Sequence, residues 1–472
     1  MTEPRHRSHW LRQALAEDTD VAPTLAGAAK ADVAIVGGGY CGLWTALELK
    51  AREPGLDVAI VERDVCGGGA SGRNAGYVLN LWSRFPTLVA LCGADGAARI
   101  GRAAAAVVDE IGTFCLEHGI DAEYRRDGWL WGATCARQAG AWDPVLETFA
   151  RSQIAPFEVL SGPDIASRWG LEGYVGGGAL APSCATVHPA KLARGLRRAA
   201  LAKGVRIYEN TPMVGLERGA RPVVRTAGGN LAADKVVLAM NAWSAGFREL
   251  RGSFIVVAAE AAISAPIPDR LAAMGWANGP AVTDSRTMIG NQRTTRDGRV
   301  EFGKGNGALA FGGNVGAVFE GAALRLPLLL RELAQAIPGL ADVAPALSWS
   351  GPIDRSADGV PLFGRLPGSE TVFYGVGFSG NGVGPSRLGG RVLASLVRDA
   401  RDEWAACGLV RPPRVAFPGE PLRAIGGAIV RRAIMRKDRL DHAGRDADPV
   451  TKRLLRFAPA GLTPTTVTPG TR

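Results

Sequence analysis

The stretch that decides the fold is Asp32-Val-Ala-Ile-Val-Gly-Gly-Gly-Tyr-Cys-Gly42. Its first five residues form a β-branched, apolar run that suits a strand buried on both faces. Apolar residues then recur at helical spacing over residues 43–50, and Glu53-Pro-Gly55 ends that pattern. A second apolar run, Asp57-Val-Ala-Ile-Val-Glu62, follows. Working outward from the glycines, the pattern predicts a complete βαβ unit.

The glycines of this unit fit the GxGxxG pattern of dinucleotide-binding proteins. Gly37 permits a tight turn, Gly39 lets the backbone approach a pyrophosphate, and Gly42 lets helix and strand pack closely. Glu62 ends the second strand 20 residues after Gly42, where its carboxylate can accept hydrogen bonds from an adenosine ribose, and Arg63 follows it. We therefore predict a bound dinucleotide, although a nicotinamide cofactor would satisfy the same geometry as a flavin.

Two later glycine-rich loops favour a flavin. Residues 66–76, Cys-Gly-Gly-Gly-Ala-Ser-Gly-Arg-Asn-Ala-Gly, could follow a long ligand towards its reactive ring. Residues 372–384 predict a strand and a glycine loop that enters a helix from about Ser386 to Val397. The N-terminus of that helix could stabilise negative charge on a reduced flavin, and a purely structural turn is the alternative. The contacts that we predict in the two loops are Ser71, Arg73, Asn74, Ala75, Gly377, Gly380, Asn381, Gly382 and Val383.

Length and composition indicate a large intracellular protein. At 472 residues, 47% of them hydrophobic, the chain can form two packed domains. Residues 1–11 lack the apolar run of a secretory signal, and the longest apolar stretch, residues 254–267, is too short to cross a bilayer. The seven cysteines form no CxxC pair and no even framework, which predicts neither zinc nor disulfides. We expect a cytoplasmic protein with no metal and no transmembrane segment.

Positive charge gathers near the end of the chain. The net charge is +10, and Arg431, Arg432, Arg436, Lys437 and Arg439 lie within a predicted amphipathic helix over residues 422–440. A solvated helix face explains such a run, and an anionic ligand, an acidic partner or nucleic acid are the alternatives. No aromatic residues interleave these charges, so we expect no nucleic acid. A Thr/Pro-rich end, predicted to be mobile, follows.

The rest of the chain predicts an α/β or α+β enzyme of two domains. Helical patterns alternate with short strands in the middle of the chain, and turn residues alternate with strands over residues 246–345, which predicts an antiparallel sheet. We assign that sheet to a substrate domain. The predicted elements are helices at 97–118 and 191–203, and strands at 205–208, 235–239, 299–303 and 308–312.

Four motifs in order give the chain a family resemblance. These are Gly37–Gly42, Gly69–Gly76, Val187-His-Pro189 and Gly377-Phe-Ser-Gly380. They resemble the D-amino-acid-oxidase-like FAD-dependent oxidoreductases from about residue 31 to residue 397. Within that superfamily the chain is most similar to the γ-glutamylputrescine oxidase and aminophosphonate oxidoreductase groups. That narrower similarity rests on residues 71–74, on Asp284-Ser-Arg286 with Asp297-Gly-Arg299, and on the arginine-rich tail.

The resemblance implies a discontinuous domain organisation. A Rossmann-like FAD-binding domain would comprise residues 31–115, 181–245 and 346–400, and it would be interleaved with an antiparallel-sheet substrate domain of residues 116–180 and 246–345. Residues 401–472 would be a basic C-terminal extension. The resemblance also implies contacts on the adenine side of FAD from the strand near Val214 and from residues 239–241.

Two departures from the sarcosine oxidases of the same superfamily bear on cofactor and substrate. Where those enzymes attach flavin through a cysteine, this chain has Gly351, so the resemblance implies noncovalent FAD. Where their late glycine loop carries a histidine and a lysine, this chain has Asn381 and Gly384. We therefore do not expect a simple N-methyl amino acid as substrate.

Flavin-dependent amine oxidation needs a positioned, neutral amine and no nucleophile. Lys304 is a candidate to present its ammonium to the flavin during reoxidation by O2, and a surface lysine in a hairpin turn, with another electron acceptor, is the alternative. His188 could orient the substrate or cap a helix. Arg73, Arg286 and Arg293 are candidates to bind an anionic end of the substrate, because guanidinium groups match carboxylate and phosphonate oxygens.

The sequence thus predicts an FAD-dependent amine oxidase or dehydrogenase. Its substrate would be a primary or secondary amine, with an aminophosphonate or another anionic amine as the narrower hypothesis, and the imine product would hydrolyse. An FAD hydroxylase that uses NAD(P)H is an alternative from another reaction class. A non-catalytic nucleotide-sensing or nucleic-acid-binding protein is a third, and it rests on the basic tail.

Overall fold

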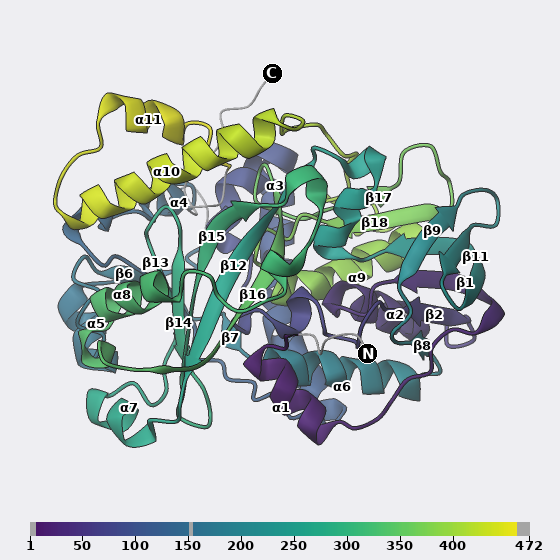
Figure 1. Ribbon diagram of the computed structural model, residues 1–472, viewed down its shortest axis with the longest axis horizontal. Coiled ribbons are helices and arrows are strands. Elements are labelled where there is room, and N and C mark those ends of the chain that lie inside the picture. The colour runs from purple at the N-terminus through teal and green to yellow at the C-terminus, as the bar shows by residue number, and fades with distance from the viewer. Residues whose placement is uncertain (1–5, 151–153, 460–472) are drawn as a thin grey trace.

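The computed structural model describes residues 6–150 and 154–459. Figure 1 shows two halves, each built on a large β-sheet, with the βαβ unit on the right and the second sheet on the left. Within the described part of the chain, no helix is both long enough and apolar enough to cross a membrane. The mixed α/β architecture, with two large sheets flanked by helices, confirms the predicted fold class.

The first sheet contains the βαβ unit predicted from the glycine motif. Strand β1 pairs in parallel with β2 and with β11, and Val33 lies opposite Val58 in this register. Val33 and Val58 are both apolar and buried, as the β-branched runs predict. The strand order is β17 (Leu362–Arg365), β18 (Val372–Val376), β11 (Gly229–Leu238), β1 (Gly27–Val36), β2 (Val58–Val61) and β8 (Arg206–Tyr208), and β10 (Val223–Thr226) pairs with β11 and with β9 (Met213–Glu217).

Helices with long apolar faces cover this sheet. Trp44 and Leu43 of α2 are fully buried in the largest hydrophobic cluster, where α2 packs against α6 and α9. Glycine makes this close packing possible, because a Cβ at Gly390 of α9 would lie 2.8 Å from Trp44. The helices are α2 (Tyr40–Arg52), α3 (Phe85–Glu117), α6 (Pro189–Ala202) and α9 (Val383–Val397).

The second sheet corrects two boundaries drawn from the sequence. Strand β16 pairs with β12 from Phe254–Ser356 to Ser264–Pro345, so residues 346–356 belong to this sheet and not to the first. Residues 300–309 form one strand, and residues 311–313 are a 3-10 turn and not a second strand, because no reversal occurs at the glycines between them. The order is β16 (Pro345–Ser356), β12 (Phe254–Ser264), β15 (Val300–Leu309), β14 (Gly290–Thr294), β13 (Ala281–Asp284), β4 (Trp129–Gly132), β6 (Gly178–Ala181) and β5 (Glu158–Leu160).

The remaining elements surround the second sheet and link it to the first. Leu329 and Leu333 of α8 pack on Phe302 of β15 in a separate core cluster. A separate two-stranded antiparallel sheet pairs β3 (Tyr77–Val78) with β7 (Ala185–Thr186). The other helices are α1 (His9–Glu17), α4 (Asp143–Glu147), α5 (Gly162–Trp169), α7 (Pro268–Met274), α8 (Leu326–Ala336), α10 (Leu422–His442) and α11 (Pro449–Leu455).

The long helix α10 of the C-terminal extension lies across the second sheet, where Figure 1 shows it in yellow. Its bounds agree with the helix predicted over residues 422–440. It contacts β15, and its Ile434 and Asp438 side chains are buried. The predicted mobile end, residues 460–472, lies outside the described residues.

Candidate active site

One cavity of about 800 Å³ lies between the two halves of the molecule. Its lining begins at Val214 and Glu62 of the first sheet, passes Gly37–Gly39 and Ser71, and reaches Trp129 and Asn291 of the second sheet. Cavities of this size hold drug-sized ligands with most of their surface buried. The cavity therefore joins the predicted dinucleotide unit to the predicted substrate sheet.

Two helices begin at this cavity without a side-chain cap. Gly39 is the N-cap of α2 and Gly382 is the N-cap of α9, and neither N-cap residue has a side chain that could accept from the free amides of its helix. Gly39, Gly382 and Val383 line the cavity. A helix start carries partial positive charge and free N–H groups, so each of these two can bind an anionic group such as a phosphate or a reduced flavin ring.

The glycines of the βαβ turn are required by close backbone contacts. Gly37 has a φ of +112°, and a Cβ there would lie 2.5 Å from the Ala239 carbonyl oxygen. A Cβ at Gly42 would lie 2.0 Å from the Gly37 carbonyl oxygen. The Glu62 carboxylate accepts hydrogen bonds from Gly38 N at 2.7 Å and from Asp64 N at 2.9 Å. Glu62 therefore fixes the turn while it lines the cavity.

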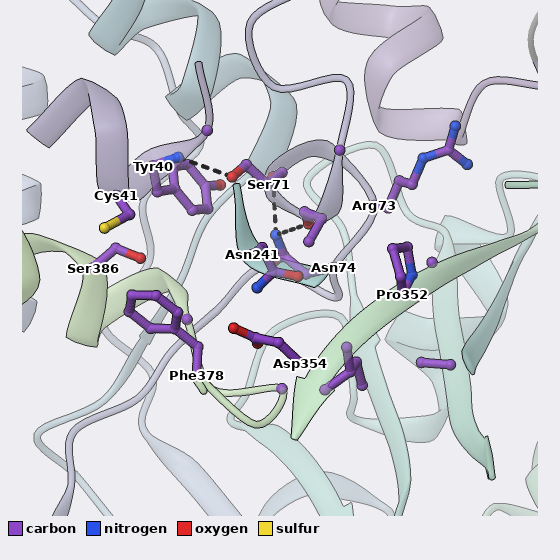
Figure 2. Close-up of a pocket in the computed structure, with 18 of the residues that line it drawn as sticks. Tyr40, Cys41, Ser71, Arg73, Asn74, Asn241, Pro352, Asp354, Phe378 and Ser386 are labelled. Atoms are coloured by element: carbon purple, nitrogen blue, oxygen red, sulfur yellow. Dashed lines mark hydrogen bonds between the residues drawn. The ribbon is translucent and has the colours of Figure 1, made fainter. Parts of the chain in front are cut away.

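The residues predicted in the second loop line the cavity but differ in what their side chains do. The Ser71 hydroxyl accepts from Tyr40 N at 2.9 Å, which joins the loop to α2 (Figure 2). The Asn74 amide donates to the Ala70 and Ser71 carbonyls and accepts from Gly76 N, so it shapes the loop. Arg63 pairs with Glu320 and stacks over Trp243, 4.3 Å from the ring centroid. Ala75 lines the cavity with them.

The segments that the family resemblance predicts on the adenine side of FAD line the cavity. Val214 is 67% exposed and lines the cavity beside Met213 and Gly215. Residues 239–241, named by the family resemblance, line it as well. Both predicted segments thus line the same cavity as Glu62 and Arg63.

Beside the late glycine loop, Asp354 of β16 brings an incompletely bonded carboxylate to the cavity. One oxygen of Asp354 accepts from Gly377 N at 2.6 Å, and its other oxygen, Oδ1, is buried without a hydrogen-bond partner among the described residues. Burial raises the pKa of this carboxyl group to about 7. Figure 2 shows Asp354 near Asn241 and Phe378. Asn381 Oδ1 is likewise buried and unpaired, whereas its amide donates to Asn80 O. Gly380 lines the same wall, whereas Gly377 anchors the loop behind it.

These observations fit FAD as the group held in the cavity. Two helix starts with glycine N-caps meet the cavity, and the Oδ1 atoms of Asp354 and Asn381 on its wall have no hydrogen-bond partner among the described residues. Gly351 lines the cavity, and a Cβ there would lie 3.4 Å from the Arg73 side chain. The cavity-lining cysteine is Cys41, whose thiol has a pKa raised to about 12 by burial.

The two residues nominated for catalysis lie in different surroundings. The Lys304 ammonium donates a hydrogen bond to Met288 O at 2.5 Å and lies 2.7 Å from the Glu332 carboxylate of α8. Lys304 lines the cavity, but its ammonium is bound by these two protein groups. His188 lies outside the cavity lining. Its Nδ1 accepts from Lys191 N at 3.1 Å, and burial lowers its pKa to about 3. This contact is the helix-capping alternative of the sequence analysis.

The three arginines nominated for an anionic substrate are all bonded to protein groups. Arg73 donates to Gly68 O, Ser350 O and His6 O, and Figure 2 shows its side chain extending away from Asp354. Arg286 pairs with Asp284 and donates to Gln335 and His442. Arg293 donates to Val187 O at 2.9 Å and lies over Trp10. Arg286 and Arg293 are outside the cavity lining.

The second sheet contributes cavity residues that the sequence analysis did not nominate. Thr283 and Asn291 lie opposite each other on β13 and β14, Trp129 donates to the Thr283 hydroxyl at 2.9 Å, and Glu301 lies on β15. All four line the cavity. The one signal in the sequence was a charged residue, Glu301, between the apolar residues Val300 and Phe302. That pattern also describes an exposed edge strand, so it did not stand out.

Comparisons with known proteins agree with this arrangement. The model of the family described as FAD dependent oxidoreductase matches residues 32–396. The chain is 29% identical to the γ-glutamylputrescine oxidoreductase of Escherichia coli over 405 residues, which cover 84% of this chain and 91% of that protein.

Solved structures give the same result. The crystal structure of glycine oxidase from Geobacillus kaustophilus is 25% identical, with a TM-score of 0.63 over 81% of this chain and 99% of that chain. For L-proline dehydrogenase from P. horikoshii the TM-score is 0.64 at 19% identity, over 79% and 94% of the two chains, which shows likeness of fold.

Proposed function

Because the chain belongs to the family of FAD dependent oxidoreductases, we propose that it oxidises the carbon–nitrogen bond of a primary or secondary amine. The observation that carries the proposal is the single cavity that joins the dinucleotide-binding turn to the second sheet. The E. coli relative is named for a putrescine derivative and other relatives for glycine, and both of these compounds are amines. When bound, FAD would accept the two electrons that leave the carbon beside the amine nitrogen.

The chain's own residues would bind, orient and shield the reactants. The starts of α2 and α9 supply backbone N–H groups to the anionic parts of the cofactor. Trp129, Thr283 and Met288 form a wall on the substrate side of the cavity. This wall excludes water from the amine, and positioning of the α-hydrogen is the main contribution that such a site makes. The imine product would then hydrolyse.

An anionic group on the substrate is not part of the proposal. Arg73, Arg286 and Arg293 give their hydrogen bonds to protein groups, as described above. An aminophosphonate would need a free guanidinium pair or a helix start to hold its phosphonate. We propose instead an amine whose ammonium is its recognised group.

We propose that the reduced flavin passes its electrons to O2 or to another oxidant, and that Lys304 takes no part in this step. Its ammonium is held by Glu332 and by the Met288 carbonyl, behind the sheet face that forms the cavity. We therefore expect Lys304→Met to change the rate of flavin reoxidation in air by less than about threefold. A peroxide assay in air, compared with reduction of an added quinone, distinguishes an oxidase from a dehydrogenase.

Anaerobic mixing tests the proposed reaction. Purified protein reconstituted with FAD would be mixed without oxygen with propylamine, N-methylpropylamine, 1,4-diaminobutane, 2-aminoethylphosphonate and glycine, while the visible flavin absorbance is followed. Bleaching by at least one of these amines is expected. Bleaching by NADPH and by none of the amines would overturn the proposal in favour of a hydroxylase.

A further inference from the structure

Glu301 is one of three carboxylates of the second sheet that line the cavity, with Glu260 of β12 and Asp354 of β16. On β15 it lies opposite Ile263 of β12 and Arg293 of β14, and side chains alternate between the two faces of a strand. Phe302 and Lys304 face α8. Glu301 therefore shares the opposite face with Gly303 and Gly305, which have no side chains to fill the space beside it. Glu301 and Asn291 both line the cavity.

Few protein groups stabilise the negative charge of the buried Glu301 carboxylate. It is fully buried, and it accepts from Asn291 Nδ2 at 3.2 Å to Oε2 and 3.4 Å to Oε1. It forms no ion pair with any described residue, and Arg293, the nearest guanidinium along the ladder, gives its hydrogen bonds to the Val187 and Gly76 carbonyls. The Tyr77 hydroxyl, which also faces this region, is bonded to the carbonyls of Val282 and Gln292.

A buried carboxylate in such surroundings is costly to the folded protein. Burial raises the pKa of Glu301 to about 8, although the charge of Arg293 and the Asn291 amide oppose that rise. The side-chain hydrogen bonds described for Glu301 come from one amide, Asn291, and a cation that entered the cavity lined by Glu301 would supply further donors. Costly groups of this kind that line a cleft are characteristic of functional sites.

We propose that Glu301, oriented by Asn291, binds the substrate ammonium and takes the proton that the amine loses before oxidation. This inference rests on the proposed function. In the transfer, one N–H bond of the ammonium breaks and one O–H bond forms on the carboxylate. The charged pair becomes a neutral amine and a neutral carboxylic acid, and no electrons change hands. Removal of the proton frees the nitrogen lone pair, which oxidation of the carbon–nitrogen bond requires.

The same carboxylate predicts the class of amine. An α-amino acid would bring its own carboxylate within a few bond lengths of Glu301, and like charges in a buried site repel strongly. The neighbouring wall of Trp129, Met288 and Ile289 is largely apolar. The favoured substrate is therefore an aliphatic amine that has no carboxylate beside its nitrogen, and glycine is disfavoured.

A non-oxidisable amine tests binding separately from catalysis. tert-Butylamine has an ammonium group but no α-hydrogen, and its binding can be followed by perturbation of the bound flavin spectrum in the holoenzyme. Loss of a partner from a buried charge pair costs at least about 2 kcal/mol, so Glu301→Gln should weaken binding roughly 30-fold or more. Glu332→Gln, the same change of charge on α8 behind the sheet, should leave it within about threefold.

The pH dependence gives a second, independent measurement. Below about pH 8 the carboxyl of wild-type protein is protonated, so affinity for the ammonium should rise as pH increases through about 8. It should fall again near pH 10, where an alkylammonium loses its proton. The titratable and charged groups that surround Glu301 are Arg293 and Tyr77. Glu301→Gln should lack the rise near pH 8, and Asn291→Leu should move it to higher pH.

The outcomes separate this inference from the proposed function. If amines bleach the wild-type flavin but Glu301→Gln binds tert-butylamine with unchanged affinity and pH profile, the inference is overturned and the function stands. If tert-butylamine binding depends on Glu301 but no amine bleaches the flavin, the proposed function fails. Should Glu301→Gln not retain flavin, the shift of the pH midpoint in Asn291→Leu decides, and an unchanged midpoint overturns the role of the pair.

Discussion

Asp438, in the C-terminal helix, should control the wall of the cavity from outside it. Its carboxylate, 6% exposed, accepts from Thr287 N at 2.8 Å and from Met288 N at 3.1 Å, and Met288 lines the cavity. Asp438→Ala leaves two buried N–H groups without an acceptor. A buried N–H group without an acceptor costs about 1–3 kcal/mol of stability. Because the loop can relax in part, we expect the two groups together to lower the free energy of local unfolding by about 3 kcal/mol.

Hydrogen exchange measures this cost where it arises. Since 1.4 kcal/mol corresponds to a factor of ten, the amides of residues 285–290 should exchange about 100-fold faster in Asp438→Ala than in wild-type protein. The KM for an amine should rise, because Met288 and Ile289 line the cavity, while FAD content stays constant.

A matched control exists in the same extension. Asp446 pairs with Arg137 but is 73% exposed, and Asp446→Ala should change exchange at residues 285–290 by less than about threefold. Exchange in Asp438→Ala that stays within threefold of wild type would show that α10 does not hold this loop, and the reasoning would be refuted.

Three further outcomes follow from the geometry. Gly42→Val should abolish FAD retention, measured by absorbance of the purified protein, because even a Cβ there would lie 2.0 Å from the Gly37 carbonyl oxygen; retained flavin would contradict this. His188→Ala should cost about 1 kcal/mol of unfolding free energy through loss of the α6 cap yet leave kcat within about twofold, and a hundredfold loss of kcat would restore its catalytic candidacy. The raised pKa of Glu301 favours the protonated form in the folded state, so its stabilising contribution is complete below pH 4.5 and is lost as pH rises through about 8. The melting temperature of Glu301→Gln should therefore exceed that of wild type at pH 9 by more than at pH 5, and an equal difference at both values would count against the burial cost.

The features that were predictable from sequence are those that local spacing specifies. The turn at Gly37–Gly42 needs glycines at fixed separations, and the strands on each side need apolar runs. A window of about 30 residues therefore contains every signal needed to predict the βαβ unit. The start of α9 is similar, because the glycines before it and the apolar pattern after it lie within one segment. Both segments line the cavity, and the family match confirms the cofactor that they predicted.

The roles of individual charged side chains were not predictable, because their partners are distant in sequence. In the sequence Arg73 resembles an anion-binding residue, but in the folded chain its guanidinium donates hydrogen bonds to the carbonyl groups of Ser350 and His6. Arg286 is likewise occupied by Asp284 and by His442, a residue 156 positions away. The pairing of β16 with β12 was not predictable for the same reason, since its partner strand begins about 90 residues earlier in the chain.

The position of α10 relative to the family match adds a reason to expect specificity from the C-terminal extension. The match ends at residue 396, whereas Asp438 and His442 lie on a helix that begins at Leu422. Asp438 holds the amides of the loop that carries Met288, and His442 accepts from Arg286 at the base of the same loop. A cofactor site common to the family thus meets a substrate wall that is held by residues beyond the family match. Differences in amine preference between this chain and its relatives should therefore depend on the extension more than on the FAD-binding turn.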